Sequence, residues 1–144
     1  LPGRRAATTR GRVVGAQLSS PDGPGATADV EIDGPADAAD ATIDVSAAAV
    51  EAAVTAAFRR RFGVAVLGTE LVAPDVLRIR SAGSTLEGRL GVGADGAITL
   101  TTALGASELL RLDPSFPLTL RSVSVVDGSL RILAVLDAGA LLGG

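Results

Sequence analysis

The chain has 144 residues, of which 47% are hydrophobic and only three are aromatic, and its formal net charge is −3. It contains no His and no Cys, which excludes a Ser-His-Asp triad, thiolate nucleophiles, disulfides and zinc sites built from these residues. The acidic balance and the scarcity of rings for base stacking argue against nucleic acid as a partner. No metal site, cofactor or catalytic constellation is recognisable, so an enzyme is not the expected class.

The N-terminal region differs from the rest of the chain. The first ten residues hold three Arg and no carboxylate, which indicates a basic arm that either stays solvated or touches anionic lipid headgroups. Residues 12–18 fit a first strand, and residues 19–25 form a loop by composition. We assign residues 1–25 to this arm, strand and loop, residues 26–137 to a single domain, and residues 138–144 to a loose C-terminal tail. No signal peptide or membrane-spanning run is visible, and the start at Leu1 indicates a processed chain or a piece of a longer one.

The clearest helix spans residues 46–62. Ser46 is a good N-cap, and Gly63 is a typical residue after a helix end. Three arginines at 59–61 would lie in the last turn, where the helix dipole favours cations. One face carries an apolar residue at every fourth position, namely Val50, Val54, Phe58 and Phe62.

Alternating apolar and polar residues predict strands over most of the remaining chain. They fall at 26–33, 41–45, 64–68, 75–81, 84–92, 97–103, 117–126 and 129–137. Asp95-Gly96 and Asp127-Gly128 predict hairpin turns, and residues 106–110 are expected to form a short helical turn. The expected fold class is therefore α+β, with one long amphipathic helix packed on a strongly curved antiparallel β-sheet.

The stretch "GVGADG" at residues 91–96 fits the pattern G-x-G-x-x-G of a dinucleotide-binding loop. Such a loop needs a helix after it, because the phosphate lies at that helix's N-terminus. The following "AITLTTA" has the two-residue period and the Thr and Ile content of a strand. We therefore predict a hairpin here, with no nucleotide as a partner, and a bulge or a close backbone approach at Gly91.

Three segments resemble the LmeA-like phospholipid-binding family of mycobacterial-type cell envelopes. They are "ATIDVSAAAVEAAV", "LVAPDVLRIRSAGSTLEGRLGVGADGAITL" and "FPLTLRSVSVVDGSLRILAVLD", and the resemblance covers about residues 41 to 137. It implies a tubular lipid-binding-like fold, in which a bent antiparallel sheet wrapped on one long helix encloses an apolar tunnel for acyl chains. It also implies an exported, envelope-associated protein with phospholipid as its partner and peripheral contact with a membrane.

The apolar pattern and this resemblance together predict that acyl chains bind in an apolar groove between helix 46–62 and the sheet. Burial would contribute about 0.8 kcal/mol per CH₂ group. The predicted lipid-binding residues are Val50, Val54, Phe58, Phe62, Leu77, Ile79, Leu90, Ile98, Leu100, Phe116 and Val125. The candidate headgroup ligands are Arg59, Arg60 and Arg61, for which plain helix-end charge is the alternative interpretation.

Two alternatives stay open. The first is a structural or interaction domain with a filled core and no ligand. The second is a phospholipase-type lipid hydrolase, an activity attributed to a member of the resembled family. No residue of this sequence can be assigned to that chemistry.

Overall fold

The computed structural model describes residues 8–21, 23, 25–35, 39–93, 96–113 and 118–136. Within these ranges the chain forms ten strands and a single helix. In chain order they are β1 (Thr8–Ser19), β2 (Ala26–Pro35), β3 (Asp40–Val45), α1 (Ala47–Phe62), β4 (Val66–Val72), β5 (Val76–Ser81), β6 (Ser84–Val92), β7 (Ala97–Thr102), β8 (Gly105–Leu112), β9 (Leu118–Val126) and β10 (Ser129–Leu136). The basic arm up to residue 7, the tail at 138–144, Asp95 and Phe116 lie outside the described residues.

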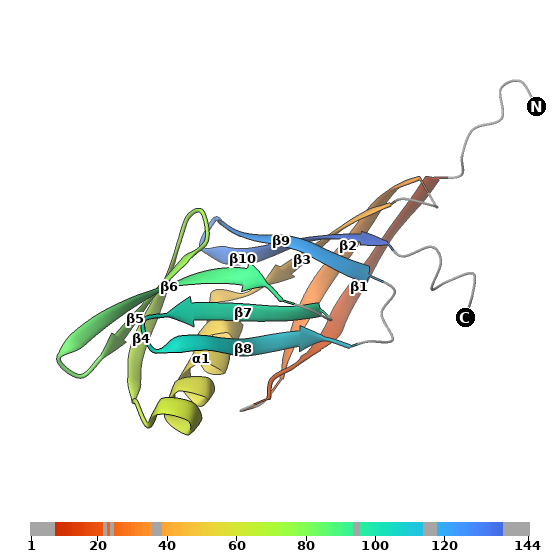
Figure 1. Cartoon of the computed structure of the whole chain (residues 1–144). Helices are drawn as coiled ribbons and strands as arrows, with labels where there is room; N and C mark the ends of the chain where they lie inside the picture. The colour runs from red at the N-terminus through yellow and green to blue at the C-terminus, as the bar shows by residue number, and fades with distance from the viewer. Residues whose placement is uncertain are drawn as a thin grey trace, which may run out of the picture.

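The ten strands form one antiparallel sheet in the order β4-β5-β6-β7-β8-β1-β2-β3-β10-β9. The sheet curls until β9 lies beside β6, so that it is barrel-like and nearly closed (Figure 1). The N–H of Val125 on β9 donates to the carbonyl of Pro74 in the β4–β5 turn at 2.7 Å. This hydrogen bond joins strands from the two ends of the sheet.

The junction between β1 and β8 is the narrowest pairing in the sheet. It consists of two residue pairs, Leu18–Leu112 and Ser19–Arg111. By contrast, β1 pairs with β2 along most of its length, and the register shifts between Val13 and Ala16. The outer parts of β1 and β2 therefore extend as a ribbon from one end of the molecule (Figure 1).

The predicted fold class is wrong. The molecule is mostly antiparallel sheet that nearly closes on itself, with one short helix, and is not a long helix covered by a curved sheet. The helix spans 16 residues and contributes five buried side chains, whereas the strands supply most of the core. The sheet, rather than the helix, therefore organises this fold.

One missed strand explains part of this error. Residues predicted to form a helical turn lie in β8, which links β7 to β1. The register of β7 against β8 shifts so that Leu109 has no partner between Glu108 and Leu110. Both Leu109 and Leu110 are then buried. Such a bulge interrupts the two-residue alternation by which a strand is recognised.

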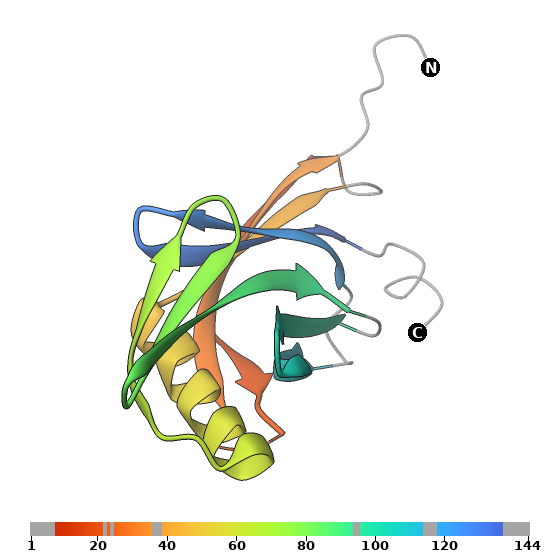
Figure 2. The ribbon, with the colours of Figure 1, turned by 60° about the vertical axis from the view of Figure 1, so that its left-hand side comes forward.

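The helix itself is confirmed. The Ser46 hydroxyl accepts a hydrogen bond from the Ala49 N–H at 3.1 Å, which satisfies one of the free donors at the helix start. Gly63 ends the helix with a φ of 65°, a left-handed conformation that suits glycine. Figure 2 shows α1 on the concave side of the sheet, where it contacts β4, β8 and β10.

Both predicted strand pairs are present, although Asp95 of the first predicted turn lies outside the described residues. Strand β7 follows "GVGADG" and pairs antiparallel with β6, and the Gly93 N–H donates to the Ala97 carbonyl at 2.8 Å. This stretch is therefore a hairpin connection and not a phosphate loop that leads into a helix. Between β9 and β10, Asp127 and Gly128 have φ values of 51° and 75°, as a tight hairpin turn requires.

Candidate functional site

Most of the predicted lipid-binding residues lie together in one interior. Three come from α1 and five from the strands β5, β6 and β7, and all belong to the main hydrophobic cluster. They are Val50, Val54, Phe58, Leu77, Ile79, Leu90, Ile98 and Leu100, each no more than 4% exposed.

The remaining predicted residues lie at the margin of this interior or outside the described chain. Phe62 is half-buried and packs against the cluster, with its ring centroid 5.2 Å from that of Phe58 in an edge-to-face arrangement. Val125 is half-buried on β9, which is an edge strand of the sheet. Phe116 lies outside the described residues.

Around α1, the described side chains of the interior are closely packed. Val54, Leu77, Ile79, Ile98 and Leu100 have no surface accessible to water. A side chain with no accessible surface borders no void that a water molecule could enter. Because an acyl chain is wider than a water molecule, these five side chains as packed leave no room for one.

Strands outside the predicted set complete the interior. Fully buried residues on β1, β2, β3, β8 and β10 include Leu18, Val30, Ile43, Leu109 and Leu130. The alternation in residues 26–33 and 41–45 signals the contributions of β2 and β3. The strand predicted at residues 12–18 lies within β1, but it was grouped with the basic arm and not assigned to the interior. The contribution of β8 was missed because of its bulge.

An open depression of about 640 Å³ lies beside the helix on the outside of the molecule. It is lined by the outward side of α1 and by β4, and the Thr69 hydroxyl donates to the Glu51 carboxylate there at 3.0 Å. Arg59 reaches this depression, whereas Arg60 and Arg61 are exposed on the last helical turn. The predicted headgroup arginines thus lie on the surface, apart from the buried side chains of the predicted lipid wall.

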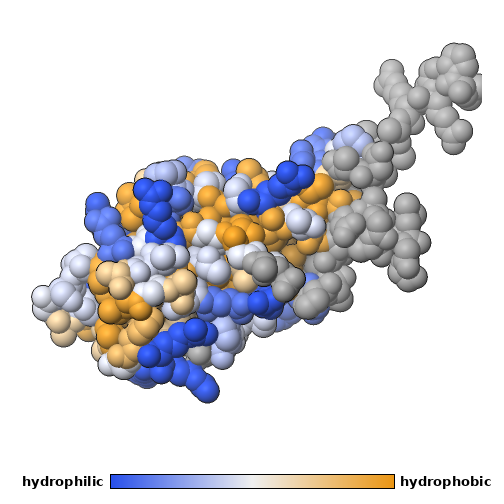
Figure 3. All heavy atoms as spheres, in the orientation of Figure 1, coloured by the Kyte–Doolittle hydropathy of each residue, from blue (hydrophilic) through white to orange (hydrophobic). Residues whose placement is uncertain are grey.

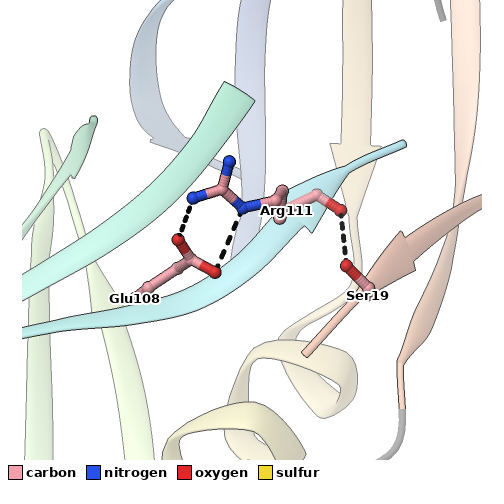
Figure 4. Close-up of polar contacts among 3 residues, drawn as sticks. All are labelled: Ser19, Glu108 and Arg111. Carbon is pink, nitrogen blue, oxygen red and sulfur yellow. Dashed lines mark hydrogen bonds and ion pairs between the residues drawn. The ribbon is translucent and has the colours of Figure 1, made fainter. Parts of the chain in front are cut away.

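At the narrow junction between β1 and β8, an ion pair within β8 lies beside a hydrogen bond that joins the two strands. Arg111 forms an ion pair with Glu108, and Ser19 donates from its hydroxyl to the Arg111 carbonyl at 3.4 Å (Figure 4). Of these two contacts, only the Ser19 hydrogen bond crosses from β1 to β8, and the Ser19 hydroxyl is directed at a backbone carbonyl rather than at a general base.

An ion pair between neighbouring strands joins β3 and β10. The Arg131 side chain donates to the Asp44 carboxylate at 3.0 Å, and this hydrogen bond raises the pKa of the Arg131 guanidinium. The pair fixes charge on the outside of the sheet. On the face drawn in Figure 3, such strongly hydrophilic side chains alternate with patches of hydrophobic surface.

Within the described ranges, acidic side chains do not gather in the groups of three or more that a metal ion would need. The helix among these residues is too short and too polar to cross a membrane. No protein-family model, curated protein or solved structure matches the chain. The likeness to the LmeA-like family and the envelope location therefore remain predictions.

Proposed function

We propose that the chain is a structural or interaction domain that acts through its surface and holds no ligand in its interior. The observation that carries this proposal is the filled core, in which α1 and the sheet bury the same side chains that would otherwise line a lipid tunnel. A packed protein interior contains few voids, and opening one removes van der Waals contacts from every residue around it. A closely packed core therefore favours a structural role over a ligand-binding one.

The proposal predicts the effect of shortening Leu100, which has no accessible surface on β7. In a packed interior, Leu100→Ala leaves a cavity and lowers the free energy of unfolding by about 3–5 kcal/mol. A leucine that lined an open tunnel would already lack neighbours on one side and would lose much less. Chemical denaturation of the purified chain measures the difference.

The matched control is Leu133→Ala on β10, because that leucine is 45% exposed and its loss should change stability by no more than about 0.5 kcal/mol. A loss at Leu100 as small as that at Leu133 would contradict the filled interior. So would stabilisation of the unsubstituted chain on addition of dioleoylphosphatidylcholine vesicles, since a bound ligand stabilises the folded state that binds it.

Binding of phospholipid acyl chains is the second candidate. It is supported by an interior that is almost entirely aliphatic, and by a sheet whose end strands β4 and β9 are not paired with each other. A lipid would then enter by separating β9 from the β4–β5 turn, where the hydrogen bond from Val125 to Pro74 lies. Detection of bound lipid by mass tests this candidate directly.

A further inference from the structure

Strand β4 is one end of the sheet, so one of its edges faces no other described strand. An edge strand exposes backbone N–H and C=O groups that can pair with a further strand. We infer that this edge binds the same edge of a second copy of the chain, forming a symmetric dimer. The inference rests on the proposed interaction function and deepens it by naming the partner.

The charges on the outward side of β4, β5 and β6 are unevenly paired. In one cross-strand row, Arg78 lies between Glu70 on β4 and Glu87 on β6. Its guanidinium is 3.3 Å from the Glu70 carboxylate and 3.9 Å from that of Glu87. Two carboxylates therefore share one cation, and the carboxylate nearer the free edge is Glu70.

The next row has the opposite imbalance. Arg80 lies between Gly68 and Thr85, and among the described residues it makes no ion pair. Its guanidinium lies over Gly68, where a Cβ atom would come within 2.8 Å of Nη2. Because Gly68 has no side chain, the Arg80 guanidinium can extend across β4 toward its free edge, where no carboxylate of the described residues neutralises it.

A symmetric pairing matches these two rows. Strand β4 runs from Val66 to Val72, so full antiparallel overlap of two copies places Thr69 opposite Thr69. Gly68 then lies opposite Glu70 of the second copy, whose carboxylate comes beside Arg80. Symmetry repeats this contact, so both arginines gain a carboxylate.

Charge also disfavours a neighbouring register. A shift that centres the pairing on Glu70 would place two glutamates directly opposite each other, and like charges at this position destabilise a strand pair. The register centred on Thr69 avoids this repulsion. It also brings Leu67, which is 66% exposed, opposite Leu71 of the second copy.

The surface beside the edge leaves room for the second copy. Four of the nine residues that line the depression between β4 and the outward side of α1 are alanine, namely Ala47, Ala48, Ala52 and Ala56. Small side chains allow a second backbone to approach closely. Side chains of the partner strand would extend into this space.

Charge reversal tests the inference. Sedimentation equilibrium of the full chain should give twice the monomer mass, and Arg80→Glu or Glu70→Arg should each weaken the dimer about tenfold or more, because each places like charges at both contacts. Mixing the two variants should restore the dimer as a heterodimer, since both contacts then join a carboxylate of one chain to a guanidinium of the other. Circular dichroism of each variant verifies that it is folded.

Arg89→Glu is the matched control, because Arg89 lies on β6, two strands from the edge, and the dimer should be unaffected. A wild-type chain that stays monomeric at millimolar concentration would overturn the inference. A mixture of the two variants that associates no better than either alone would also overturn it. Denaturation of the Leu100→Ala variant tests the packing of the interior, whereas sedimentation tests association through the β4 edge. The proposed function and the proposed dimer can therefore be contradicted independently.

Discussion

Gly88 is the residue at which the backbones and side chains of neighbouring strands approach most tightly on β6. A Cβ atom there would lie 2.7 Å from methyl carbons of Leu100 and Thr102 and 2.9 Å from the carbonyl oxygen of Thr101. Gly88→Ala should therefore lower the free energy of unfolding by about 1–3 kcal/mol through overpacking. Thermal or chemical denaturation measures this change.

The comparison is Gly11→Ala on β1, where a Cβ atom would meet nothing within 4 Å and stability should change by no more than about 0.5 kcal/mol. Equal stability of the two variants would show that β6 and β7 are not packed as described. The sequence predicts a bulge or a close backbone approach at Gly91 instead. Gly91 pairs with Thr99 without a register shift, and the atom nearest to a Cβ there would lie 3.7 Å away. Spacing within one strand does not reveal which atoms of its neighbour stand opposite.

At the scale of elements, the N-terminus of α1 depends on the hydroxyl of Ser46, which accepts from the Ala49 N–H. Ser46→Ala should lower the free energy of unfolding by about 1 kcal/mol, because that N–H then loses its partner. Ser46→Asp should retain most of the stability, since a carboxylate can accept the same hydrogen bond. Chemical denaturation tests both variants, and an unchanged Ser46→Ala protein would contradict the cap.

Elements whose conformation is set by their own residues could be predicted from the sequence. Elements whose conformation depends on a neighbouring strand could not. Ser46, Gly63 and the Asp127-Gly128 pair determine their own conformations, and they correctly predicted a helix and a hairpin. Strand β8 was missed because Leu109 is an unpaired residue opposite β7. That irregularity exists only in the pairing of two strands, so the sequence of β8 alone resembles a helical turn.

At the scale of the whole molecule, the sequence identified interior side chains without revealing what surrounds them. Eight predicted lipid-binding residues do lie together. Whether such residues line a tunnel or fill a core depends on how far the sheet closes, and closure is set by contacts between β9, β6 and the β4–β5 turn. These contacts join segments far apart in the chain, which residue periodicity does not address.

Native mass spectrometry of the full chain, followed by organic extraction, shows whether the interior holds lipid. If side chains fill the interior, only ligand-free masses and no extracted phospholipid are expected, both before and after incubation with phospholipid vesicles. A bound mass that matches phospholipid, recovered on extraction, would contradict the filled interior and favour the lipid-binding candidate.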